Sequence, residues 1–313
     1  MEELLLVEPD FNIDVHTEET ERFVIARGEM RGYRETMEDR CCFEKNLCNT
    51  MSYISVFDGH GGQVAPHYIN QHISKYISDN LKDFSFEAAS LSSKTDLEAR
   101  IRKSIKEIDH DLCTIVESID ERMLKQNPHH QVDESGTTLC SVLLFENKNL
   151  DIVCVNAGDS RCVLFDGEST VQLSDDHKPY NAAETNRIIN AGGFLEDNRI
   201  NGDLSVSRGL GDFRFKKNDK LPQEQQILTC DPDFAYFTFE ENSKGERFIV
   251  VACDGLYDVM SSQDVVDYVR KALKSHPDLS ANNAQEVLCD LMNHCVKDLE
   301  SADNVSVVLV FIK

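Results

Sequence analysis

The sequence is poor in basic residues and has no long hydrophobic run. Its 313 residues include 32 Lys and Arg against 56 Asp and Glu, which gives a formal charge of −24. Nucleic-acid backbones and anionic membranes are bound by clusters of Lys and Arg, so this balance argues against both as partners. No apolar run approaches the roughly 18 residues that a membrane-spanning helix requires. The carboxylate excess would instead suit binding of divalent cations, although an acidic surface alone indicates little.

Tryptophan is absent, and the eleven cysteines include no Cys-x-x-Cys pair. An odd number of cysteines in a chain of this length argues against a disulfide framework, which is typical of short secreted proteins. The apolar run Leu4–Val7 is short and has acidic flanks, so it is not a signal peptide, and Glu2 excludes N-myristoylation. We therefore expect reduced cysteines in a cytoplasmic protein. The lack of a basic import cluster leaves a nuclear pool open.

Short apolar or alternating segments and longer segments of helical spacing follow one another along the chain. The spacing of about ten residues between strands, with tight turns, indicates antiparallel sheets, and the main helices come in two pairs. This order favours an α+β fold over βαβ units. We expect residues 1–22 to be an acidic N-terminal tail and residues 23–313 to be one domain. The predicted strands are 23–30, 41–44, 52–57, 137–146, 150–158, 160–166, 169–174, 248–253 and 305–312, and the predicted helices are 64–77, 97–123, 182–191, 261–274 and 282–299.

Several carboxylates lie at the ends of predicted strands. Asp58 and Asp254 each follow a strand that we expect to be wholly buried and precede a glycine, Asp303 precedes the last strand, and Glu38 and Asp39 precede the second. An ionised carboxylate there is costly without a positive partner, and no Lys or Arg is adjacent to Asp58 or Asp254. A divalent cation would resolve the repulsion, and oxygen ligands without a Cys or His cluster favour Mg²⁺ or Mn²⁺ over zinc. The alternative is that these residues cap turns and helices separately.

Two further side chains are candidates for chemistry at the same place. His60 follows the Asp58-Gly59 step and could be a metal ligand, a general acid or a polar loop residue. Arg34 could hold a phosphate through a bidentate contact, or it could form a surface ion pair.

Taken together, nine segments resemble the metal-dependent Ser/Thr protein phosphatase family, also called PPM or type 2C (PP2C). They occur in the family's order and span nearly the whole chain, from residue 27 to residue 311. The resemblance implies a four-layer αββα sandwich, in which two antiparallel β-sheets are flanked by helix pairs and the metal site lies at one end. The matching segments are 33–39, 56–62, 135–138, 156–161, 176–179, 191–193, 204–212, 252–258 and 301–306.

The resemblance also implies a ligand set for two Mn²⁺ or Mg²⁺ ions. Asp58 would bridge the ions, while Asp254 and Asp303 and the Gly59 carbonyl would complete their coordination. Glu38 would act through water, and Asp39 would lie behind the ligands. By the same resemblance, Asp159 corresponds to a position that, with Asp254, holds a weaker third ion in some members, and Asn304 would orient Asp303.

The implied activity is that of a protein-serine/threonine phosphatase, with phosphoserine and phosphothreonine proteins as substrates. A water bridging the two ions would attack phosphorus in line. Arg34 would bind the phosphate, and His60 would be the general acid that protonates the departing Ser or Thr oxygen. We expect a monomer that binds neither nucleic acid nor membrane.

Some residues depart from the family's usual pattern. Tyr257 stands where Trp is usual, Leu139 stands where Ala or Cys is common, and Asp203 and Gly209 also differ. They affect packing or the substrate-facing flap, which we place at 180–199, and none is an implied ligand. Two alternatives stay open: a catalytically inactive regulatory protein with the same fold, and a two-metal hydrolase of small phosphate esters.

Overall fold

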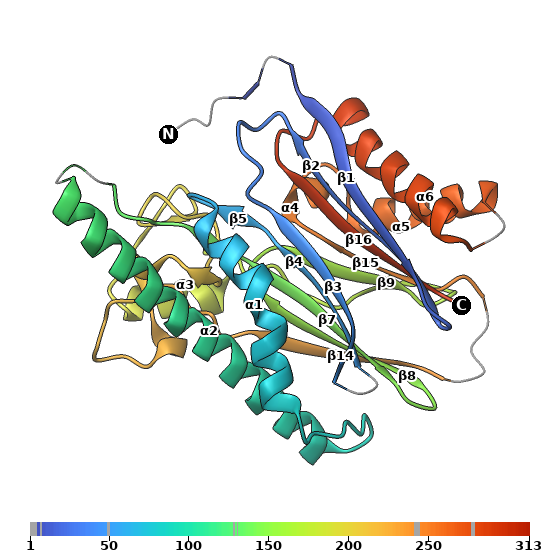
Figure 1. The fold of residues 1–313 in the computed structure, drawn as a ribbon, viewed down its shortest axis with the longest axis horizontal. Helices are drawn as coiled ribbons and strands as arrows, with labels where there is room; N and C mark the ends of the chain where they lie inside the picture. The colour runs from blue at the N-terminus through green and yellow to red at the C-terminus, as the bar shows by residue number, and fades with distance from the viewer. Residues whose placement is uncertain are drawn as a thin grey trace.

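Two antiparallel sheets lie face to face, and a pair of helices covers the outer face of each (Figure 1). The computed structural model describes residues 5–6, 8–48, 51–127, 129, 131–240, 245–276 and 279–313. The predicted four-layer αββα sandwich of an α+β protein is confirmed. No helix among these residues is both long and apolar enough to cross a membrane.

The first sheet has six strands and carries the chain's last strand near its middle. The strand order is β1-β2-β16-β15-β9-β10, and every neighbouring pair is antiparallel. Helices α5 and α6 pack on its outer face. The elements are β1 (Asp10–Glu19), β2 (Phe23–Gly32), β9 (Arg161–Phe165), β10 (Thr170–Gln172), β15 (Phe248–Ala252), β16 (Val305–Ile312), α5 (Ser262–Ser275) and α6 (Ala281–Asn293), which continues into a π-helical turn, η3 (His294–Asp298).

The second sheet has five strands in the order β14-β8-β7-β4-β3. Helices α1 and α2 pack on its outer face, and α2 is much the longest helix (Figure 1). The elements are β3 (Arg40–Cys48), β4 (Met51–Phe57), β7 (Leu139–Glu146), β8 (Leu150–Ala157), β14 (Asp233–Phe239), α1 (Val64–Leu81) and α2 (Leu91–Gln126).

Strands β4, β8, β15 and β16 are buried along their whole length, because both faces of each sheet are covered. Along β2 the side chains alternate: Phe23 and Ile25 point between the sheets, whereas Val24, Ala26 and Met30 face the helices. Burial of this kind contributes about 1.5–3 kcal/mol for each large side chain. The two sheets are therefore held rigidly, and the loops at their ends have a fixed frame.

Two segments differ from the sequence-based expectations. Residues 10–19 were expected to lie in an acidic tail, but they form the edge strand β1, paired with β2 from Asp10 to Glu19. Their apolar side chains, such as Ile13, pack against the helix-facing core and alternate with charged ones that face outward. Strand β14 was not predicted at all. Both are edge strands, which are only half-buried and give weak hydrophobic patterns.

The remaining short elements lie at the end of the sandwich where the predicted site residues gather. A three-stranded sheet, β13-β6-β5, joins segments that are far apart in the chain. The segment 180–199, where the flap is expected, contains α3 and the hairpin β11-β12, which ends at Ile200. The elements are β5 (Gly59–His60), β6 (Gly136–Thr137), α3 (Ala182–Asn190), β11 (Leu195–Glu196), β12 (Arg199–Ile200), β13 (Leu210–Gly211), η1 (Phe213–Phe215), η2 (Gln223–Gln225) and α4 (Asp254–Tyr257).

Candidate metal centre and active site

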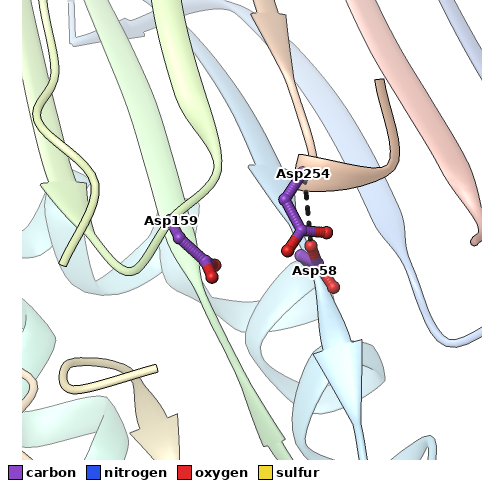
Figure 2. A group of neighbouring side chains, drawn as sticks. All are labelled: Asp58, Asp159 and Asp254. Atoms are coloured by element: carbon purple, nitrogen blue, oxygen red, sulfur yellow. Dashed lines mark hydrogen bonds between the residues drawn. The ribbon is translucent and has the colours of Figure 1, made fainter. Parts of the chain in front are cut away.

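Three aspartates from three different strand ends converge. Asp58 follows β4, Asp254 follows β15 by two residues, and Asp159 lies in the loop between β8 and β9 (Figure 2). Each offers a carboxylate oxygen, and these atoms all lie within 4.8 Å of one another. The backbone N–H of Asp254 also donates to Asp58 Oδ2 at 3.4 Å. The two sheets thus bring together carboxylates that are up to 196 residues apart in the chain.

The electrostatics of this group favour a cation. Burial, together with the charges of neighbouring carboxylates, raises the pKa of Asp58 well above its usual value. Burial and the charge of Asp254 raise the pKa of Asp159 to about 7. Both shifts show that ionised carboxylates are unfavourable here without more positive charge. A hard divalent ion with oxygen ligands would supply that charge, so the residues fit the ions that the sequence predicted.

Asp303 and Arg34 form an ion pair beside the three aspartates. Arg34 Nη2 lies 2.8 Å from Asp303 Oδ2. The Asn304 backbone N–H donates to Asp303 Oδ1 at 2.6 Å. The Asn304 side-chain amide donates to the carbonyls of Arg31 and Thr36, on either side of Arg34 in the sequence. Asn304 therefore positions Asp303 through its backbone and positions the loop that carries Arg34 through its amide.

Glu38 and Gly59 lie in contact, but the Glu38 carboxylate is outside the group of three. Its oxygens accept hydrogen bonds from the Thr36 hydroxyl at 2.9 Å and from the Gly62 N–H at 3.0 Å. A Cβ at Gly59 would lie 2.4 Å from the Glu38 carbonyl oxygen, so only glycine allows this approach. The arrangement is compatible with Glu38 acting through water, and that role stays a prediction.

Asp39 is buried beneath these residues. The residue is 2% exposed, and its Oδ2 atom has no hydrogen-bond partner among the described residues. Burial and the charge of Asp303 raise the pKa of Asp39 to about 8. An acceptor atom left without a donor at this depth is costly, and nearby positive charge would lower that cost.

His60 is held by a carboxylate that the sequence analysis did not single out. His60 Nε2 lies 2.6 Å from Oδ2 of Asp212, which is 1% exposed. Burial alone would lower the pKa of His60, but the charge and hydrogen bond of Asp212 outweigh burial and raise it. Asp212 ends the family-like segment 204–212, which was the available signal, and its φ of +50° turns the chain there.

Lys178 is the second residue that the sequence analysis missed. Its ammonium forms an ion pair with Asp159, and Nζ lies 3.6 Å from Asp254 Oδ2. No Lys or Arg is adjacent to Asp254 in the sequence, but Lys178 lies next to it in the folded chain. Lys178 comes from the family-like segment 176–179, four residues before α3, so it links the three aspartates to the base of the flap.

A separate buried charge cluster holds the flap. Glu184, in α3, forms ion pairs with Arg187 and with Arg208, the latter at 2.7 Å. Arg208 also lies 2.9 Å from Asp233 at the start of β14. Burial alone would raise the pKa of Glu184, but hydrogen bonding and charge from the arginines lower it to about 2. The flap is thus tied to the second sheet without any added ion.

The positions that depart from the family pattern lie outside the three aspartates. The Tyr257 ring packs in the core, and Arg161 Cζ lies 4.5 Å from the centroid of this ring. Leu139 is buried in β7. Asp203 forms an ion pair with Arg214. These contacts are consistent with effects on packing and on the flap.

Comparisons with known proteins show the family of the chain. The family described as Protein phosphatase 2C matches residues 23–305. Protein phosphatase 2C homolog 2 of Saccharomyces cerevisiae is 34% identical over 290 residues, covering 90% of this chain and 56% of the yeast protein. Probable protein phosphatase 2C 11 of Oryza sativa subsp. japonica is 31% identical, covering 94% of this chain and 86% of the rice protein. The chain thus spans little more than half of the yeast relative.

Solved structures show the same fold. A phosphatase from Toxoplasma gondii superposes with a TM-score of 0.75 at 24% identity, covering 95% of both chains. Serine-threonine phosphatase 2C from the same organism gives a TM-score of 0.73 at 20% identity, covering 99% of this chain and 98% of that one. Together with the sequence matches, these findings show that the chain belongs to the protein phosphatase 2C family of protein serine/threonine phosphatases.

Proposed function

We propose that the chain hydrolyses phosphoserine and phosphothreonine in proteins with two Mn²⁺ or Mg²⁺ ions, and that a third ion binds more weakly. The observation that carries this proposal is the convergence of Asp58, Asp159 and Asp254, whose oxygens lie within 4.8 Å of one another. Asp303 and the Gly59 carbonyl would complete the ligands, with Glu38 and Asp39 behind them. Bound divalent ions supply a water of lowered pKa and offset the charge of the phosphoryl group.

The chain's own residues would bind and orient the substrate. The Arg34 guanidinium presents five N–H groups, and its ion pair with Asp303 fixes it at the edge of the group of aspartates. A phosphate oxygen there would receive charge-assisted hydrogen bonds, which are about twice as strong as neutral ones. Arg34 would therefore hold the phosphate and stabilise the charge that develops in the transition state.

His60 would give its proton to the departing Ser or Thr oxygen. The contact with Asp212 fixes the imidazole ring and favours its protonated form, as a general acid requires. Such acid catalysis typically contributes about 10²–10⁴-fold in rate.

Two alternatives lead to different expectations. An inactive regulatory protein of this fold would be expected to lose carboxylates, yet Asp58, Asp254 and Asp303 are all present. A hydrolase of small phosphate esters would need only the ions, so Arg34 and the flap distinguish it from a protein phosphatase.

The test is hydrolysis of a phosphothreonine peptide and of a small aryl phosphate with Mn²⁺, with Mg²⁺ and with EDTA. We expect turnover of the peptide that depends on the metal and is abolished by EDTA. Binding of divalent ions by calorimetry without any turnover would favour the regulatory protein. Turnover of the aryl phosphate alone would favour the small-ester hydrolase, and no bound ion would contradict the proposed centre.

A further inference from the structure

A polar groove lies beside the metal centre, between the edges of the two sheets. The groove is open to solvent and has a volume of about 750 Å³. Strands β1 and β2 form one side, and β3 with the start of α1 forms the other. Two lining residues adjoin loops of the proposed site: Met37 immediately precedes Glu38, and Gln63 immediately follows Gly62. The groove therefore borders these two loops.

Two arginines in this groove have no carboxylate partner among the described residues. Arg27 Nη1 donates to the Cys41 carbonyl at 2.6 Å, and Arg40 Nη1 donates to the Met37 carbonyl at 3.0 Å and to the Asp39 carbonyl at 2.5 Å. Each guanidinium has five N–H donors, so both side chains keep donors beyond these contacts. Arg31, also in the groove, is already paired with Asp10 at 3.0 Å.

Each acidic residue of the groove has a partner. Asp10 is paired with Arg31, Glu29 Oε1 accepts the Cys41 N–H at 2.7 Å, and Asp14 Oδ1 lies 3.3 Å from His16 Nε2. Three arginines and three carboxylates line the groove, so its formal charge is zero. In a chain of charge −24, an anionic ligand meets far less repulsion there than over the average surface.

Asn70, in α1, adds a group suited to a peptide chain. Its side chain lines the groove, and Oδ1 is buried without a hydrogen-bond partner among the described residues. A carboxamide carries two N–H donors that can bind the carbonyl of a peptide group, whereas the buried Oδ1 is not accessible to a ligand.

We propose that this groove binds an acidic side chain of the phosphoprotein substrate, with Arg27 and Arg40 contacting the carboxylate and Asn70 contacting the peptide backbone. The inference rests on the proposed phosphatase activity and adds a substrate class to it: phosphoserine or phosphothreonine with Asp or Glu a few residues away. The groove lies next to the proposed phosphate-binding loop, because Arg31, at the end of β2, lines the groove and is three residues before Arg34 in the sequence.

The first test uses the wild-type enzyme. Phosphothreonine peptides carry one Glu, scanned from two to five residues on either side, and each is compared with the same peptide carrying Gln. We expect kcat/KM to be about 3- to 10-fold higher for Glu at one or two positions, mainly through KM, as charge-assisted contacts at a half-exposed site allow. Equal kcat/KM for every Glu and Gln pair would overturn the proposal.

Variants then assign the preference to the groove. Arg40→Gln and Arg27→Gln should remove the preference for Glu and leave turnover of the Gln peptide and of an aryl phosphate near wild type. Gln at position 27 can still donate to the Cys41 carbonyl. Asn70→Ala should raise KM for both peptides and leave the aryl phosphate unchanged. Arg100→Gln, on α2 and paired with Asp96, is the matched control.

The outcomes separate the groove from the catalytic site. A preference for Glu that survives in both arginine variants would contradict the proposal that this groove binds an acidic side chain. An equal loss on peptide and aryl phosphate would show that the arginines act through the neighbouring carboxylates, which also contradicts it. Absence of metal-dependent turnover on every substrate, in the wild type, would instead contradict the proposed function.

Discussion

The metal centre and the flap each contain a buried cluster of charged side chains, but only the flap cluster contains enough cations. Glu184 is paired with Arg187 and Arg208, and its pKa is lowered to about 2. At the metal centre Asp39 and Asp159 have pKa values raised to about 8 and about 7, although Lys178 lies beside Asp159.

The difference separates a structural cluster from a candidate binding site on physical grounds. Carboxylates that already have arginine partners gain nothing from a ligand, and removing one partner leaves a buried charge. Carboxylates that crowd together with raised pKa values gain from any cation that reaches them. The following changes test this distinction, from the largest expected effect to the smallest.

Asp58→Ala should have the largest effect, because it removes a carboxylate from the centre of the group. We expect loss of divalent-ion binding and a fall in kcat/KM of about 10³-fold, which corresponds to about 4 kcal/mol. Calorimetry and peptide hydrolysis measure the two effects. Asp166→Ala is the matched control, because Asp166 also precedes a glycine but caps an exposed hairpin. Full turnover by Asp58→Ala would contradict the centre.

Glu184→Gln should damage the flap cluster without touching the ions. The two arginines would lose their shared negative partner, and we expect a loss of about 3–5 kcal/mol in the free energy of unfolding. Ion binding at low temperature should stay at the wild-type level. Weakened ion binding in a variant that is still folded would show that the two clusters are not independent.

His60→Ala should lower kcat by about 10²-fold through loss of the general acid. The loss should be larger for substrates whose leaving group has a high pKa than for an aryl phosphate. His67→Ala, an exposed histidine on α1, is the control. An equal loss on good and poor leaving groups would count against the acid role.

Lys178→Met should change ion binding in the opposite direction from Asp58→Ala. The Lys178 ammonium contacts Asp159 and Asp254, so it competes with an ion for the same oxygens. We expect about tenfold tighter binding of the weakest ion, measured by calorimetry. Lys75→Met, in an exposed pair with Asp79, serves as the control. Unchanged affinity would mean that Lys178 moves aside at no cost.

The pH dependence of stability tests the same distinction without a substitution. In metal-free protein the raised pKa values mean that folded Asp39 and Asp159 bind protons that the unfolded chain has already lost. Stability should therefore fall as pH rises from about 4 to about 8. Saturating Mn²⁺ should remove this slope, because ions bind the deprotonated form. If the Tm of the metal-free protein rises with pH over this range, the predicted direction of the pH dependence is wrong. Glu184 acts oppositely, with stability lost as pH falls from about 4.5 to about 2.

Much of the fold could be predicted from sequence because the buried strands and the amphipathic helices carry strong patterns. Strand β16 has the predicted bounds, Val305–Ile312, and the helix expected from residue 64 begins there. The edge strands β1 and β14 were missed because one of their sides is not covered by a neighbouring strand, which weakens burial. The alternating aromatics of β14 (Asp233–Phe239) were an available signal.

The site was predictable in its carboxylates but not in the groups that contact them. Asp58 and Asp254 could be found because each charge follows an apolar strand. Lys178 and Asp212 reach the site from loops 19 and 152 residues from their partners Asp159 and His60, and local sequence contains no information on such distances. Only the segments shared with the family indicated them.

The position of β16 also has a consequence for biosynthesis. This strand lies between β2 and β15, and Asp303 immediately precedes it. At about 5–20 residues per second, the ribosome releases β2 tens of seconds before β16 is available to pair with it. During that interval β2 has an unpaired edge, and the aspartates from earlier strands lack Asp303. The unpaired edge of β2 is therefore open to pairing with other chains until β16 is made, and the proposed ligand set is complete only once Asp303 has been synthesised.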